Sequence, residues 1–185
     1  MAKKETEEVN IVKEIIGTVL YFVFIIVAVW FAVTYIGQRT EVSGNSMYDT
    51  LEHEDNLWID KISYRFKDPE RFDIIVFPYH DSEVYYIKRI IGLPGERIRI
   101  EEDGTIFVNN EPLEEKYGYE TISPTMIGRA KNNIILGEDE YFVMGDNRND
   151  SEDSRFESVG NIHKDRIIGK AVFRIWPLSK FGKIE

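Results

Sequence analysis

The stretch VYYIKRIIGLPG, residues 84–95, decides the fold of this chain. Its first eight residues are mostly β-branched or aromatic, which favours extended backbone, and its last four form a Gly-Leu-Pro-Gly turn signal. Because alternate residues of a strand project to one face, the lysine at position 88 shares its face with Val84, Tyr86 and Ile90. The stretch therefore predicts a strand that carries one lysine among apolar and aromatic neighbours.

Similar stretches occur on both sides of it, each bounded by turn residues: 73–77, 97–100, 105–108, 141–144 and 167–176. Hardly any helical periodicity interrupts them. Short strands at regular spacing predict a mainly β domain over residues 39–185, built from an antiparallel sheet that is barrel-like or folded. Residues 111–135 are less regular, and we expect an insertion or a flexible flap there.

Residues 15–38, IIGTVLYFVFIIVAVWFAVTYIGQ, contain no Asp, Glu, Lys or Arg. As a helix this stretch is about 36 Å long, enough to cross a hydrocarbon core of about 30 Å. A cleavable signal peptide is disfavoured, because the apolar stretch is too long and no A-x-A-like cleavage site follows it. The other alternative is a buried helix of a soluble protein. We expect a transmembrane anchor, with the lipid bilayer as a partner.

The basic residues near this anchor are unevenly distributed. Lys3, Lys4 and Lys13 precede it, and only Arg39 follows closely. The positive-inside rule therefore predicts a short cytoplasmic N-terminus over residues 1–14 and an extracytoplasmic β domain. The chain is accordingly expected to be a single-pass protein of the cell membrane.

Composition excludes several kinds of site. The 185 residues include no cysteine, so disulfides, thiolate zinc sites, iron–sulfur clusters and cysteine nucleophiles are absent. The formal charge of −10 argues against binding to nucleic acid. An EF-hand alignment that begins at Asp146 lacks the required glycine and puts Arg148 at a ligand position, so no metal site is expected. His53, His80 and His163 show neither metal-ligand spacing nor pairing with a serine, and we expect them on the surface.

Two polar features have no packing role in this pattern. Ser46 lies in SGNSMYDTL, residues 43–51, where a turn would expose its hydroxyl beside its backbone N–H, as a nucleophile and an oxyanion donor require. Taken alone, this segment favours a linker that leaves the membrane. Lys88 is a candidate for burial, and lowering its pKa to about 8 would cost roughly 3 kcal/mol but would create a base for a serine proton. Its alternative role is that of an edge-strand lysine that limits aggregation.

A third polar segment, GDNRNDSEDSR at residues 145–155, directly follows an apolar strand. Its alternating charges predict an ion-paired loop that stiffens a neighbouring site. A solvated surface loop remains the alternative.

Taken in order, the anchor, SGNSMYDTL, YIKRIIGLPGE and GDNRNDSEDSR resemble bacterial type I signal peptidases, or leader peptidases. These are membrane-bound serine proteases with a Ser-Lys dyad that remove signal peptides from exported proteins. The resemblance covers residues 10–178 and implies a mostly β fold, secretory preproteins as substrates, and no metal or cofactor. It implies that Ser46 is the nucleophile and that Lys88 is the neutral general base.

The resemblance also implies supporting roles. Ser151 matches the residue that orients the lysine amine, and Asp153 and Arg155 match an ion pair behind the site, with Asp146 a further structural carboxylate. The family's second oxyanion donor, sometimes a serine hydroxyl, falls by position on Gly44.

Substrate recognition is implied as well. Four residues match positions that line shallow pockets for small side chains, with an A-x-A-like preference before the cut: Met47, Leu51, Tyr86 and Ile87. This chain has Asp49 where the family often has proline, and a carboxylate there is a candidate to steady a protonated Lys88.

Three aromatic residues follow Ser46 within some thirty positions: Trp58, Phe66 and Phe72. Their side chains are equally consistent with contact with the lipid surface and with packing in the core.

Two alternatives accompany the peptidase hypothesis. Self-cleaving repressors share Ser-Lys chemistry but lack a membrane span. A catalytically silent, membrane-anchored homologue that acts as a binding module would keep the fold without the activity. The sequence predicts no oligomeric state.

Overall fold

The computed structural model describes residues 11–80 and 82–184. The chain forms two compact units, Met1–Ile36 and Gly37–Glu185. In the first unit, α1 (Ile11–Phe31) continues as a short π-helix (Ala32–Ile36). Together they contain a stretch, Val12–Ile36, that is long and apolar enough to cross a membrane, and its side chains are not buried within the protein. Lys3 and Lys4, on which the predicted orientation depends, lie outside the described residues.

The helical part ends two residues before the predicted end of the anchor. Gly37 and Gln38 already belong to a strand, where they pair with Asp60 and Ile59. A side chain at position 37 would lie within 2.7 Å of the Ile59 carbonyl oxygen and of the Trp58 ring. The glycine therefore allows the strand to pair directly after the helix.

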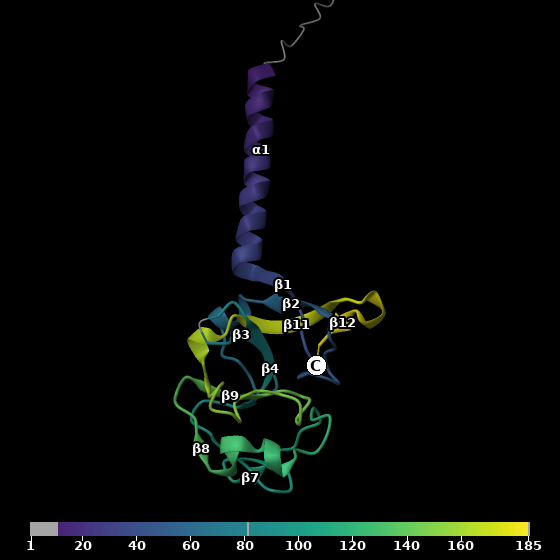
Figure 1. The fold of residues 1–185 in the computed structure, drawn as a ribbon. Coiled ribbons are helices and arrows are strands. Elements are labelled where there is room, and N and C mark those ends of the chain that lie inside the picture. The colour runs from purple at the N-terminus through teal and green to yellow at the C-terminus, as the bar shows by residue number, and fades with distance from the viewer. Residues whose placement is uncertain (1–10, 81, 185) are drawn as a thin grey trace, which may run out of the picture. The chain divides into compact units, whose positions relative to one another are not determined.

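The second unit consists mainly of antiparallel strands, as predicted (Figure 1). In spatial order the larger sheet contains β1 (Gly37–Glu41), β2 (Asn56–Asp60), β11 (Gly169–Trp176), β3 (Ile74–Pro78), β4 (Tyr85–Gly92), β9 (Glu140–Met144) and β10 (Ile162–His163), with β12 (Gly182–Lys183) paired to β11. The smaller sheet contains β7 (Glu111–Pro112), β6 (Ile106–Val108), β5 (Arg97–Ile100) and β8 (Ile134–Ile135). Five 3-10 turns lie between strands in the described part of the chain: Ser63–Arg65, Pro124–Met126, Gly128–Lys131, Lys164–Arg166 and Leu178–Lys180.

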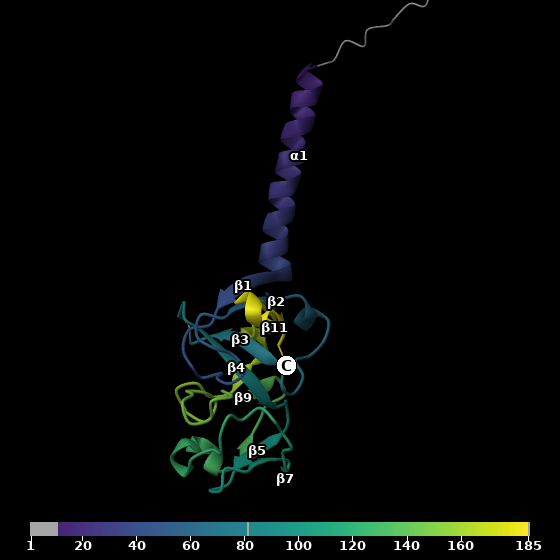
Figure 2. The ribbon, with the colours of Figure 1, turned by 90° about the vertical axis from the view of Figure 1, so that its right-hand side faces the viewer.

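The strand order locates the ends of the larger sheet. It runs from β1 to β10, and within the described residues these two edges do not pair with each other. In both views of the second unit, the smaller sheet lies at the end away from β1 and β2 (Figures 1 and 2). Within the described residues the larger sheet is therefore open at its edges.

Among the described residues, buried apolar side chains form three clusters. One lies between the smaller sheet and β9, and it includes Ile98, Ile106 and Phe142. Residues 111–135, predicted as an insertion or flap, supply four members of that cluster: Ile122, Ile127, Ala130 and Ile134. This segment is irregular in backbone but packs into the core, because its apolar residues cover the smaller sheet.

The three aromatic residues left open by the sequence differ in exposure. Phe66 is 84% exposed and Trp58 is 38% exposed. Phe72 is partly buried and packs against the cluster beside the smaller sheet. Phe72 therefore has the packing role, whereas the other two present aromatic surface to their surroundings.

Candidate active site

Ser46 and Lys88 meet although 42 positions separate them. Ser46 lies in the turn between β1 and β2, and Lys88 lies within β4. The Lys88 Nζ donates a hydrogen bond of 2.7 Å to Ser46 Oγ and one of 3.2 Å to the Ile87 carbonyl oxygen. Ser46 is half-buried, whereas Lys88 is only 4% exposed. The linker and edge-strand alternatives therefore do not describe these residues, which form one contact pair.

Burial is the main cause of the lowered pKa of Lys88. Loss of solvent lowers its pKa to about 8, although the negative charges of Asp153 and Glu152 favour the ammonium form. The Arg155 guanidinium further lowers the pKa, and Asp146 raises it. Asp49 is exposed and is not among these four charges, so the predicted interaction with Lys88 is not observed. An amine with a pKa near 8 is partly neutral at neutral pH and can accept a proton.

Asp153 organises the loop that follows β9. Its carboxylate accepts hydrogen bonds from the Gly145 N–H (2.9 Å), the Ser151 hydroxyl (2.7 Å), and Nε and Nη2 of Arg155 (both 2.8 Å). The side chains of Asp153 and Arg155 are fully buried. The ion pair implied by the resemblance is thus present, and it is saturated with partners as a buried pair requires.

Gly145 brings this loop against the nucleophile. A side chain at position 145 would lie 2.3 Å from the Ser46 carbonyl oxygen and 2.3 Å from Ser151 Oγ. Next to it, the Asn147 N–H donates to the Ser46 carbonyl at 3.1 Å. The backbone of the loop therefore supports the Ser46 turn directly.

Ser151 lies in this loop but is not bonded to the lysine. Its hydroxyl proton is used by Asp153, and within the described part of the chain the Lys88 amine bonds to Ser46 and Ile87 instead. The orienting contact predicted for Ser151 is therefore absent from this arrangement. Its oxygen still has lone pairs that can accept a hydrogen bond from the amine.

A second buried ion pair joins the lysine strand to the same loop. Arg89 donates to Asp146 through Nε (2.9 Å) and Nη2 (2.8 Å), and the Thr50 hydroxyl donates to the same carboxylate at 2.6 Å. Asp146 is thus a buried carboxylate that links Arg89 and Thr50. Arg89 and Thr50 were not predicted, although an arginine between apolar strand residues, next to Lys88, was a usable signal.

Part of the irregular 111–135 segment also contacts this region. The guanidinium of Arg148 pairs with both Glu115 oxygens, with Nη2 at 2.6 Å from Oε2. The ring of Tyr117 lies 3.7 Å from the Arg89 guanidinium carbon, and the Tyr119 N–H donates to the Asp146 carbonyl at 2.9 Å. Nothing local in the sequence indicated these contacts, since the partners are about 30 positions apart.

A groove of about 640 Å³ opens beside Ser46 and Lys88. Three of the four residues that the resemblance assigns to substrate recognition line it: Met47, Tyr86 and Ile87. Leu51 does not: it is fully buried in the cluster that also contains Met47 and Ile87. Leu51 therefore presents no surface to the groove; the turn after Ser46 directs it into the core, where it packs with Met47 and Ile87.

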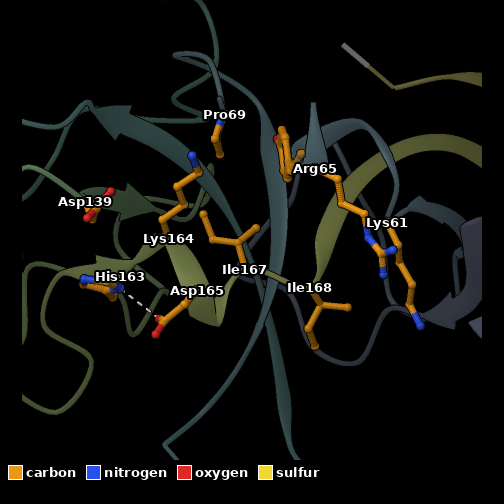
Figure 3. Close-up of a pocket in the computed structure, with 10 residues that line it drawn as sticks. Lys61, Arg65, Pro69, Asp139, His163, Lys164, Asp165, Ile167 and Ile168 are labelled. Atoms are coloured by element: carbon orange, nitrogen blue, oxygen red, sulfur yellow. Dashed lines mark hydrogen bonds and ion pairs between the residues drawn. The ribbon is translucent and has the colours of Figure 1, made fainter. Parts of the chain in front are cut away.

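A second cavity, of about 580 Å³, lies elsewhere in the second unit (Figure 3). It is lined by charged and apolar residues that include Lys61, Arg65 and Lys164, with no serine among them. His163 there bonds to Asp165 at 2.9 Å and is exposed, as are His53 and His80. Among the described residues no group of His, Asp and Glu is arranged to hold a metal ion. Since the two cavities are similar in size, their residues decide which one is suited to covalent catalysis.

The comparisons with known proteins agree on one family. The sequence profile described as "Signal peptidase, peptidase S26" matches residues 15–176. The chain is 34% identical to "Probable signal peptidase I-2" of Synechocystis sp., over 97% of this chain and 80% of that protein. It is 38% identical to "Signal peptidase I" of Leptolyngbya laminosa, over 82% and 74% of the two chains, and 38% identical to "Signal peptidase I" of Bacillus caldolyticus, over 76% and 80%.

Among solved structures, a crystal structure of a signal peptidase I from Enterococcus faecalis V583 is 32% identical to this chain. The matched region covers 56% of this chain and 97% of the Enterococcus faecalis chain, with a TM-score of 0.46.

Proposed function

This chain belongs to the signal peptidase family, peptidase S26, and is a signal-peptide-cleaving protease; from that premise we propose that it cleaves secretory preproteins with Ser46 as nucleophile and Lys88 as general base. The observation that carries this proposal is the 2.7 Å separation of Lys88 Nζ and Ser46 Oγ. A nucleophile within hydrogen-bond distance of a base with a lowered pKa is the arrangement that covalent hydrolysis needs.

Acylation begins when Ser46 Oγ attacks the scissile carbonyl carbon and the hydroxyl proton passes to the neutral Lys88 amine. The carbonyl oxygen becomes an oxyanion. The Ser46 N–H would stabilise it, since within the described residues this group makes no backbone hydrogen bond that competes with the oxyanion. As the C–N bond breaks, the Lys88 ammonium protonates the leaving amine, and an ester to Ser46 remains.

Deacylation repeats these steps with water. The Lys88 amine accepts a proton from water as its oxygen attacks the ester carbonyl. The bond from the carbonyl carbon to Ser46 Oγ then breaks, and the ammonium returns the proton to Ser46 Oγ. Both half-reactions start from a neutral amine, which burial of Lys88 supports.

The loop after β9 supports the same chemistry. Asp153 and Arg155 place charges of opposite sign behind Lys88. When the amine moves between Ser46 and substrate, Ser151 Oγ is the nearby acceptor that would orient it, because its own proton is held by Asp153. Gly44 offers no hydroxyl, so any second oxyanion donor must be another group.

We further propose that the substrate residues before the cut are small. The walls of the groove include Met47 and Ile87, which are only 2% and 8% exposed and leave shallow surfaces. The apolar stretch Val12–Ile36 would anchor the enzyme, with its N-terminus in the cytoplasm and the β domain outside. A common bilayer would raise the effective concentration of a membrane-bound signal peptide.

The proposal is tested with the full chain in membranes and a fluorescent preprotein that carries an A-x-A site. We expect cleavage at that site by the wild type, and loss of cleavage in Ser46→Ala and in Lys88→Ala. Cleavage by all three would identify a contaminant and remove the evidence for both roles. If folded wild type binds the preprotein without cleaving it, the chain is a silent homologue that acts as a binding module.

A further inference from the structure

Tyr86 is the aromatic wall of the groove beside the reacting atoms. It lines the same groove as Ser46 and Lys88, and the Lys88 Nζ lies 4.9 Å from the centre of its ring. Residues 86 and 88 share a face of β4, so the ring and the amine project together. A substrate side chain that enters the groove next to Ser46 therefore meets this ring.

Neighbouring aromatic rings hold Tyr86 from the side of β3. Tyr79 stacks on it with ring centroids 4.7 Å apart and an interplanar angle of 19°. Phe77, its partner in the β3–β4 register, meets it edge-on at 6.1 Å. Such contacts restrict the tilt and displacement of a half-buried ring.

The hydroxyl of Tyr86 is held separately, from the loop after β9. It donates to Glu152 Oε2 at 3.0 Å, and the other Glu152 oxygen accepts from the Ser158 hydroxyl at 2.6 Å. Burial and this hydrogen bond raise the pKa of Tyr86 to about 12, so the phenol keeps the proton that it donates. Glu152 is exposed and needs no partner for its own solvation, so the bond serves to place the ring.

We propose that Glu152 is a positioning residue that locks the Tyr86 ring, already stacked on Tyr79, and so sets the largest substrate side chain that the groove accepts. This inference rests on the proposed peptidase function. A free tyrosine ring can change rotamer and open space beside Ser46, whereas a ring fixed at both its face and its hydroxyl cannot. Discrimination against larger residues before the cut then depends on a hydrogen bond at the rim of the groove.

The test uses the full chain in membranes with three preproteins: one with the A-x-A site, and two in which one or the other alanine is replaced by leucine. The measured quantity is the ratio of kcat/KM for a leucine substrate to kcat/KM for the alanine substrate. Glu152→Ala removes the acceptor, Tyr86→Phe removes the donor, and Glu152→Gln removes the charge but keeps an acceptor. Glu157→Ala, which removes the same charge from an exposed side chain of the same loop, is the matched control.

We expect Glu152→Ala and Tyr86→Phe each to raise the leucine-to-alanine ratio about tenfold at one of the two positions, the scale of a methylene-sized change in an apolar pocket. The double variant should match the single variants, because both remove one bond. Glu152→Gln and Glu157→Ala should keep the wild-type ratio.

Three results would overturn the inference. The first is a leucine-to-alanine ratio in Glu152→Ala that equals the wild-type ratio. The second is a ratio in Glu152→Gln that equals the ratio in Glu152→Ala. The third is a double variant in which the effects of Glu152→Ala and Tyr86→Phe on this ratio add. A merely structural role would lower both values of kcat/KM together and leave the ratio unchanged. If the wild type cleaves none of the preproteins, the peptidase proposal has failed instead, and the two failures are thereby distinguished.

Discussion

Arg89 and Asp146, 57 positions apart, form a two-point ion pair in which the side chains are 1% and 0% exposed. The pair joins β4, which carries Lys88, to the loop that contacts the Ser46 carbonyl. Thr50, from the Ser46 turn, donates to the same carboxylate. One buried contact thus ties together the three segments of the candidate active site.

Removing Asp146 should therefore destabilise the protein strongly. Asp146→Ala leaves the Arg89 guanidinium buried without its carboxylate, and we expect a loss of about 3–5 kcal/mol in the free energy of unfolding. Urea denaturation of the full chain in detergent measures it. The control is Glu102→Ala, which breaks an exposed pair with Lys131. If both variants lost a similarly small free energy of unfolding, the stabilising role of the buried Arg89–Asp146 pair would be contradicted.

The pH dependence of cleavage should report the lysine. With a pKa of Lys88 near 8, kcat/KM should increase as pH rises through about 8, because only the neutral amine accepts the serine proton. Glu152 favours the ammonium form, so Glu152→Gln should move this rise to lower pH. A rise centred near 6.5 would instead indicate a histidine, and one near 10.4 an exposed lysine.

Burial of Lys88 should also lower the free energy of unfolding. Its folded pKa, about 8, lies below the ordinary value of 10.5, so between these values the unfolded chain binds more protons and stability rises with pH. We expect Lys88→Met to be more stable than the wild type by about 1–3 kcal/mol at pH 7. The difference should shrink as pH increases from 8 to above 10, in urea denaturation at several pH values. A constant difference would contradict this origin.

Gly145 should tolerate no side chain. In Gly145→Ala the new methyl group would lie 2.3 Å from the Ser46 carbonyl oxygen, so the Ser46 turn must move. We expect kcat/KM to fall by about 100-fold or more, since a misplacement of about 1 Å has an effect of that size. Gly182→Ala, where the added methyl group meets nothing within 4 Å, is the control and should keep its activity.

Several features were predictable because they depend on neighbours in the chain. The strand 84–91 follows from β-branched and aromatic residues before a glycine-rich turn, and the structure has β4 at Tyr85–Gly92. The shared face of Tyr86 and Lys88 follows from the two-residue period of a strand. The polar strand β1, GQRTE, was missed because its extended conformation comes from pairing with β2 rather than from its own residues.

The sequence by itself determined the apolar stretch, six of the twelve strands in the described residues, and the residue types needed for Ser-Lys hydrolysis, because these depend on local composition and period. Only the tertiary structure decided that Lys88 is buried 2.7 Å from Ser46, that Leu51 lies in the core, and which charges pair. Arg148 with Glu115 shows why: 33 positions separate them, and only the packed chain removes water from both. A lowered pKa or a buried ion pair arises from that loss of water. Which groups lose water depends on tertiary packing and cannot be read from the local sequence.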